Sequence, residues 1–194
     1  GGVVVDSGTF DWSNGRYPVV AAPSAAYHGL AFHETFGTYG YLMKLRAETR
    51  RDLGAALAPL NAFLFMQGLE TLQLRMARHV ANAETVARWL TEQPRVERVR
   101  YAGLPDSPYA RLKGKYLPRG AGAVFCFDLA GGRDAGRTFI EALTLFSHLA
   151  NVGDAKSLVI HPASTTHRQL TDAELAAAGI GPGTIRLSIG IEDA

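Results

Sequence analysis

Residues 185–190 constrain the fold most, because apolar and polar side chains alternate there with a two-residue period and an arginine stands inside the run. This alternation predicts a half-buried β-strand. An arginine on such a strand is costly unless its guanidinium meets an anion, and its planar fork of donors suits a carboxylate. We therefore interpret Arg186 as a carboxylate-binding residue at the rim of a sheet. The alternative is an exposed strand arginine without a function, which composition alone favours.

A polar loop, residues 151–167, precedes this strand. It opens with an Asn-x-Gly-Asp turn at Asn151, continues through a short apolar run, and ends with hydroxyl and imidazole side chains crowded around one proline. That many hydrogen-bonding groups exceeds what a spacer needs. We expect Asn151 and the pair Thr165 and Thr166 to face the guanidinium of Arg186.

The composition excludes several classes of function. The 194 residues are 47% hydrophobic and carry a formal net charge of +2, which is too small to indicate nucleic acid or a membrane surface as a partner. The single cysteine, Cys126, excludes an intrachain disulfide and favours a reducing, cytoplasmic location. His28 and His33 have no third partner at a metal-ligand spacing, so we expect no metal site. No apolar run reaches membrane-spanning length.

The periodicity along the chain predicts an α/β region followed by a small α+β domain. We expect strands at residues 1–6, 96–101, 123–129 and 157–160, and helices at residues 40–57, 62–92 and 134–146. A capping box at Thr171 and Glu174 predicts a further short helix that stops at Gly179. We place the domain boundary within the long helix near Arg78, which gives domains of residues 1–78 and 79–194.

Three ordered motifs give a specific signal. They are N-x-G-x-x-x-S-L from Asn151, H-P-A-S-x-T-H over residues 161–167, and R-L-S-x-G-x-E from Arg186. Their order resembles the C-terminal part of the Cys/Met-metabolism family of pyridoxal-phosphate (PLP) enzymes. The aromatic segment at residues 11–41, with its strings N-G-R-Y-P and E-T-F-G, resembles the O-acetylhomoserine sulfhydrylase branch of that family.

The resemblance implies a fold and a set of site residues. Residues 1–78 would end the PLP-binding large domain of an aspartate aminotransferase-like, fold type I enzyme, and residues 79–194 would form its small substrate-binding domain. Arg186 would hold the substrate α-carboxylate, Asn151 would assist it through its side chain and backbone, and Thr166 would lie near the same pocket.

The Schiff-base lysine would lie upstream of this chain. The chain has four lysines, and none stands in the lysine motif of the family: Lys44, Lys113, Lys115 and Lys156. We therefore expect no catalytic residue in this chain, no activity from it alone, and cofactor-binding residues that the sequence does not identify.

The resemblance also implies a reaction and partners. The intact enzyme would replace the acetate of O-acetylhomoserine with sulfide or a thiol, giving homocysteine or methionine in the cytoplasm. Its partners would be the amino-acid substrate, the upstream part of the same enzyme and further copies in a dimer of dimers.

Alternatives stay open at the substrate loop. The lyase branch commonly has Glu-Ser-Leu-Gly-Gly where this chain has Ala-Asn-Val-Gly-Asp at residues 150–154, which favours a sulfhydrylase but leaves the acyl and sulfur donors open. The chain could instead be a non-catalytic fragment that needs the lysine-bearing half, or part of a related cystathionine or methionine γ-lyase or synthase.

Overall fold

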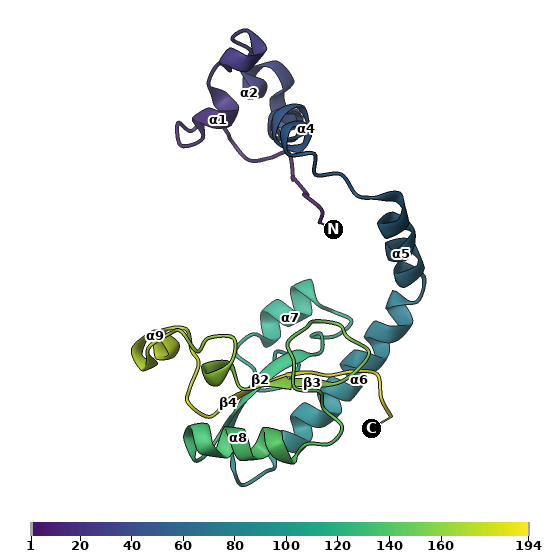
Figure 1. The fold of residues 1–194 in the computed structure, drawn as a ribbon, viewed down its shortest axis with the longest axis vertical. Helices are drawn as coiled ribbons and strands as arrows, with labels where there is room; N and C mark the ends of the chain where they lie inside the picture. The colour runs from purple at the N-terminus through teal and green to yellow at the C-terminus, as the bar shows by residue number, and fades with distance from the viewer. Residues whose placement is uncertain (1, 194) are drawn as a thin grey trace. The chain divides into compact units, whose positions relative to one another are not determined.

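A computed structural model describes residues 2–193 of the chain (Figure 1). The chain forms two compact units that divide between Gly68 and Leu69. The boundary expected near Arg78 thus falls inside the second unit, within a helix.

The first unit consists of short helical segments and loops. The segments are α1 (Pro18–Ala21), η1 (Ala25–Tyr27), α2 (Phe32–Phe36), η2 (Gly37–Tyr39), α3 (Gly40–Lys44), the π-helical η3 (Leu45–Arg50) and α4 (Arg51–Leu53). Aromatic side chains pack on one another: Trp12 stacks on Tyr41 with ring centroids 4.8 Å apart, and Phe10 meets Trp12 edge-on at 4.7 Å. These contacts leave Trp12 and Tyr41 half-buried and Phe10 exposed.

Two expectations for the first part of the chain were wrong. Residues 2–6 form no strand; Val3 and Val5 are exposed, and no neighbouring strand satisfies the backbone groups there. The helix expected at residues 62–92 is two helices, α5 (Pro59–Glu70) and α6 (Leu72–Thr91), because Thr71 departs from helical geometry.

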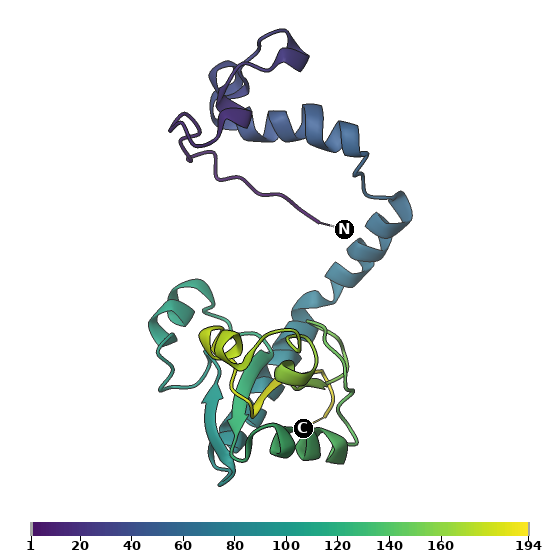
Figure 2. The same ribbon diagram turned by 60° about the vertical axis from the view of Figure 1, so that its left-hand side comes forward.

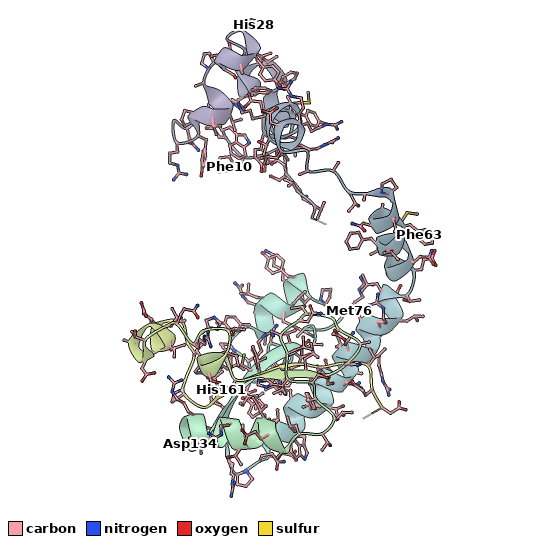
Figure 3. All side chains as sticks on the ribbon, viewed as in Figure 1. Phe10, His28, Phe63, Met76, Asp134 and His161 are labelled. Atoms are coloured by element: carbon pink, nitrogen blue, oxygen red, sulfur yellow. The ribbon has the colours of Figure 1, made fainter. Side chains whose placement is uncertain are left out.

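The break between α5 and α6 has a physical cause. Gly68 and Thr71 favour the helix weakly, and α5 buries none of its side chains, so no packing enforces a continuous helix. Figure 3 labels Phe63 among the side chains that project from α5.

The second unit is built on a four-stranded antiparallel sheet in the order β1-β2-β4-β3. Its strands are β1 (Val96–Arg100), β2 (Val124–Leu129), β3 (Leu158–Ile160) and β4 (Thr184–Ser188), and its helices besides α6 are α7 (Ala110–Tyr116), α8 (Gly132–Ala142), η4 (Pro162–Ser164) and α9 (Asp172–Ala177). Every strand expected in this unit is present, which confirms a fold of helices on a four-stranded sheet. Helix α7 was not predicted, because glycine and proline interrupt the pattern on both sides of it.

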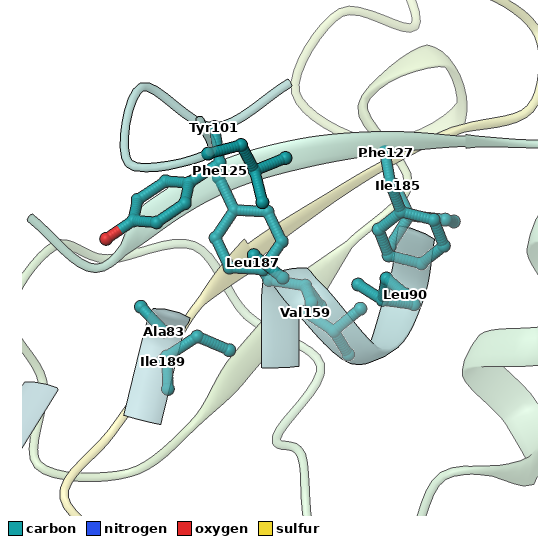
Figure 4. Close-up of a cluster of buried hydrophobic side chains, with 11 residues drawn as sticks. Ala83, Leu90, Tyr101, Phe125, Phe127, Val159, Ile185, Leu187 and Ile189 are labelled. Atoms are coloured by element: carbon teal, nitrogen blue, oxygen red, sulfur yellow. The ribbon is translucent and has the colours of Figure 1, made fainter. Parts of the chain in front are cut away.

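Helices α6 and α8 cover one face of the sheet (Figures 1 and 2). Strand alternation turns Phe125 and Phe127 of β2 and Ile185 and Leu187 of β4 toward these helices, where all four are buried (Figure 4). A Cβ at Gly183 would collide with the carbonyl of Leu129, so the entry to β4 requires glycine. The core packing therefore fixes the position of β4 in the sheet and its register with β2.

The opposite face of the sheet carries polar side chains on β1, β2 and β4 beside the buried Leu158 and Ile160 of β3, and we call it the polar face. Arg100 Nη2 donates to Asp128 Oδ1 at 2.8 Å, and the hydroxyl of Thr184 donates to the same oxygen at 2.5 Å. Arg186 lies on this face, next to Cys126 on β2. Burial raises the pKa of the Cys126 thiol even though Arg100 and Arg186 act against it, which fits the expected inert cysteine rather than a nucleophile.

Candidate carboxylate-binding site

Arg186 occupies the middle of β4, between two strands. Its Cα is paired with Cys126 of β2 on one side and Ile160 of β3 on the other. Hydrogen-bonded ladders on both sides fix its backbone, and its side chain is half-buried on the polar face. The guanidinium is thus presented from a rigid element, as a binding site needs.

The guanidinium of Arg186 has capacity to bind an anion. Its Nη2 donates to the backbone carbonyl of Asn151 at 3.3 Å. Within residues 2–193, no carboxylate lies at ion-pair distance from Arg186, whereas Arg100 on the same face is paired with Asp128. A guanidinium has five N–H donors, and those that remain can hold a carboxylate by two parallel hydrogen bonds.

Asn151 closes a tight turn and offers its carbonyl to Arg186. Its side-chain oxygen accepts from Val152 N at 2.9 Å, and its Nδ2 donates to Asp154 Oδ2 at 3.3 Å. Gly153 has a φ of +75°, a left-handed conformation that favours glycine. The side chain of Asn151 therefore shapes the turn, and its backbone makes the contact with Arg186.

Asp154 stabilises the same turn by its charge. The pKa of its carboxyl is lowered, first by the hydrogen bond from the Lys156 backbone N–H and then by that from Asn151. The carboxylate is therefore ionised at neutral pH and holds the turn closed.

Thr166 lies apart from this contact. Its exposed hydroxyl is 2.9 Å from His167 Nδ1, and no hydrogen bond links it to Asn151 or Arg186 among the residues that the structure describes. The hydroxyl of Thr165 donates to the carbonyl of His161 at 2.8 Å, so the structure brings Asn151 to Arg186 but neither of the two threonines.

The rest of the H-P-A-S-x-T-H motif is a buried corner. His161 is 3% exposed, and its Nε2 donates to the carbonyl of Pro182 at 2.7 Å. Since Nε2 carries the proton, Nδ1 accepts from the Ser164 hydroxyl at 2.8 Å. A Cβ at Gly136 of α8 would come within 2.9 Å of the His161 ring, so α8 packs closely against this ring. His161 therefore joins η4, α8 and the start of β4 (Figure 3).

Two residues with a direct effect on this loop were missed. The backbone N–H of Ser157 donates to Glu192 Oε1 at 2.6 Å, and its hydroxyl donates to Glu192 Oε2 at 2.9 Å. Burial opposes ionisation of Glu192, but these hydrogen bonds outweigh it and lower the pKa of the carboxyl. Ser157 and Glu192 belong to the first and third motifs, and this membership is the sequence signal that could have identified them.

The surroundings of three of the four lysines are defined by the structure. Lys44 pairs with Glu48, the ammonium of Lys115 lies over the ring of Tyr116, and Lys156 is exposed. Residues 2–193 contain no group of three side chains able to hold a metal ion, and none of their helices is both long and apolar enough to cross a membrane.

The profile of one protein family matches the whole chain. Its description is "Cys/Met metabolism PLP-dependent enzyme", and it matches residues 1–194. An O-acetyl-L-homoserine sulfhydrylase of Thermus thermophilus is 49% identical over 191 residues, which are 98% of this chain and 45% of that protein. A homocysteine synthase of Schizosaccharomyces pombe is 50% identical over 194 residues, again 45% of that protein. The chain spans about half the length of the curated relatives it matches.

A solved structure has the same fold. It is an O-acetylhomoserine (thiol)-lyase of Campylobacter jejuni that carries a pyridoxyl-lysine phosphate, and it matches 93% of this chain and 42% of its own with a TM-score of 0.81 and 42% identity.

Proposed function

Because the chain belongs to the Cys/Met-metabolism family of PLP-dependent enzymes, we propose that it is the C-terminal portion of an O-acetylhomoserine sulfhydrylase. The intact enzyme replaces the acetate of O-acetylhomoserine with sulfide or a thiol and gives homocysteine or methionine. Arg186 carries this proposal: it is a guanidinium on a rigid strand, contacted by a backbone carbonyl and without a carboxylate partner among residues 2–193.

The residues of this chain fit the substrate side of a PLP active site. When bound, PLP supplies an electron sink for charge that develops at the substrate Cα. Arg186 would bind the α-carboxylate and so fix the rotation of the substrate about its Cα. We also assign Thr166 to the wall of the substrate pocket, although its hydroxyl lies next to His167 Nδ1 and makes no hydrogen bond to Asn151 or Arg186.

Asn151 gives Arg186 its orientation. Its carbonyl accepts one guanidinium N–H at 3.3 Å and leaves the other donors for the substrate. The turn that holds this carbonyl is closed by Asp154, whose carboxylate accepts from Asn151 and from the Lys156 backbone. A neutral carbonyl suits this position, because a carboxylate there would compete with the substrate for Arg186.

The proposal extends to domains, assembly and location. Residues 1–78 end a fold type I large domain and residues 79–194 form its small domain. The lysine that binds PLP comes from the rest of the polypeptide. The enzyme is a cytoplasmic dimer of dimers; the thiol of Cys126, unpaired in this chain, is compatible with a reducing compartment.

Product analysis of the full-length, PLP-bound protein tests the reaction. We expect acetate release from O-acetylhomoserine that depends on sulfide or a thiol and is matched by formation of homocysteine or its S-alkyl product. O-acetylserine serves as the control acyl donor. Formation of an α-keto acid and ammonia without added sulfide would indicate a lyase and contradict the proposal.

A further inference from the structure

The segment that follows β4 folds back against the substrate-side loop. The amide of Ile191 donates to the carbonyl of Ala155 at 3.0 Å, and the amide of Gly190 donates to the hydroxyl of Ser157 at 2.8 Å. These bonds join the end of the Arg186 strand to the end of the loop that begins near Asn151. The loop that carries Asn151 and the strand that carries Arg186 are therefore also joined here, at a second place.

The carboxylate of Glu192 adds two hydrogen bonds between the loop and the segment after β4. Glu192 accepts the Ser157 amide on Oε1 at 2.6 Å and the Ser157 hydroxyl on Oε2 at 2.9 Å. Ser157 is 4% exposed, so these charge-assisted bonds are shielded from water on the serine side. Gly190 makes room for them, since a Cβ there would stand 2.6 Å from the amide nitrogen of Ser157 and would also strike the carboxylate. We call this pair of bonds the Ser157–Glu192 latch.

Helix α6 anchors the latch to the core. The side-chain amide of Asn82 donates to the backbone carbonyl of Glu192 at 2.7 Å and to that of Gly190 at 3.2 Å. His79 Nδ1 lies 2.6 Å from the carbonyl of Ile189, and both His79 and Asn82 are buried. The backbone of Glu192 thus has a fixed position, and its carboxylate is a fixed acceptor for the loop.

The loop itself is otherwise held mainly at its ends. Ser147 N donates to the Ser157 carbonyl at 3.0 Å, and the hydrogen bond from Asn151 to Asp154 is local to the turn. Asn151 is exposed and contacts the sheet through Arg186. Its position therefore depends on where Ser157 is held.

We propose that Ser157 and Glu192 are positioning residues for substrate binding, because their latch fixes the loop that presents the Asn151 carbonyl to Arg186. This inference rests on the proposed function of Arg186. Neither residue touches the substrate; opening the latch lets the loop move and leaves the guanidinium without its orienting contact.

Two readouts on the full-length, PLP-bound enzyme test the latch. In Glu192→Ala, hydrogen exchange of residues 148–157 should become about tenfold faster, and KM for O-acetylhomoserine should rise by about tenfold while kcat changes by less than about twofold. Glu192→Gln keeps one acceptor oxygen for Ser157 and should recover much of both effects. Glu141→Ala removes an exposed carboxylate paired with Arg137 on α8 and serves as the matched control.

Several outcomes would overturn the inference. Unchanged exchange, unchanged KM, or a change in one without the other would each contradict a latch that acts through the loop. If Glu192→Ala fails to fold, Ser157→Ala provides the test. It removes the hydroxyl bonds to Glu192 Oε2 and Gly190 N but keeps the backbone bond to Glu192 Oε1, so exchange of the loop and KM should both rise by less than about tenfold. A wild-type enzyme that does not turn over O-acetylhomoserine would contradict the proposed function and this inference together, whereas an active wild type with unaffected variants would contradict the inference alone.

Discussion

The two faces of strand β4 differ in what fixes their residues. On one face, Ile185 and Leu187 are 0% and 2% exposed and pack with the core under α6 and α8. On the other face, Thr184 and Arg186 make polar contacts, to Asp128 and to the carbonyl of Asn151. Neighbouring residues of one strand thus serve different purposes: the first face requires shape and apolar volume, and the second requires particular hydrogen-bonding groups.

This difference means that stability and substrate binding can be separated within one strand. A change on the core face removes packing that the whole second unit shares. A change at Arg186 removes a group that contacts no buried side chain by hydrogen bond and has no ion-pair partner among residues 2–193. The following experiments would sharpen or break that separation.

Ile185→Ala should have the largest effect on stability. It leaves a cavity in a fully buried position and should lower the free energy of unfolding by about 2–5 kcal/mol. Denaturant unfolding of the full-length enzyme measures this, with Ile185→Val as the graded control at about 1 kcal/mol. A loss below that of the valine variant would show that the core face of β4 is less tightly packed than the structure indicates.

Arg186→Ala should have the largest effect on binding. We expect KM for O-acetylhomoserine to rise by roughly 100-fold, while the free energy of unfolding changes by less than about 0.5 kcal/mol. Arg186→Lys keeps the charge but cannot make two parallel hydrogen bonds, so it should recover only part of the loss. Steady-state kinetics and unfolding on the same samples would test this; a destabilised Arg186→Ala enzyme would break the separation of the two faces.

Thr184→Val should have an intermediate effect on stability, because it tests the polar face outside the binding site. The Thr184 hydroxyl donates to Asp128 and accepts from Gly181 N at 2.8 Å, in a position that is 1% exposed. Loss of the hydroxyl should lower the free energy of unfolding by about 1–3 kcal/mol and leave KM unchanged. Thr184→Ser should retain most of the stability. An altered KM would mean that this network also orients Arg186.

Tyr101 provides a smaller effect that depends on pH. Burial, and then the charge of Glu84, raise the pKa of its hydroxyl from 10.0 to about 12. The folded state therefore keeps a proton that the unfolded state loses above pH 10.0, so stability falls as pH rises from 10.0 toward 12. Phenolate absorbance of the wild type minus that of Tyr101→Phe should show this late titration. A Tyr101 that ionises with the exposed tyrosines would contradict the buried position.

The sequence contains clear information on β4 and its surroundings. Alternation in residues 185–190 predicted the strand and the two faces, and the capping box of Thr171 and Glu174 is present at α9. The contact between Asn151 and Arg186 followed from the motifs, since a loop and a strand rich in polar groups were expected to face each other. These features depend on local patterns, which a sequence shows directly.

Features that depend on distant contacts were harder to predict. Residues 2–6 have a strand composition but no strand neighbour, and the break at Thr71 reflects the absence of packing around α5. Thr166 belongs to the right motif, but its hydroxyl bonds to His167. The pairing of Ser157 with Glu192 spans a long stretch of chain that no local pattern encodes.

The most direct test of the central assignment is a coupling experiment between Arg186 and the substrate carboxylate. kcat/KM of the full-length enzyme would be measured for O-acetylhomoserine and for its neutral α-carboxamide, with wild type and with Arg186→Ala. Wild type should prefer the carboxylate by roughly 100-fold, and Arg186→Ala should treat the two substrates alike within about threefold. If Arg186→Ala keeps the full preference for the carboxylate, another residue binds that group and the role assigned to Arg186 is wrong.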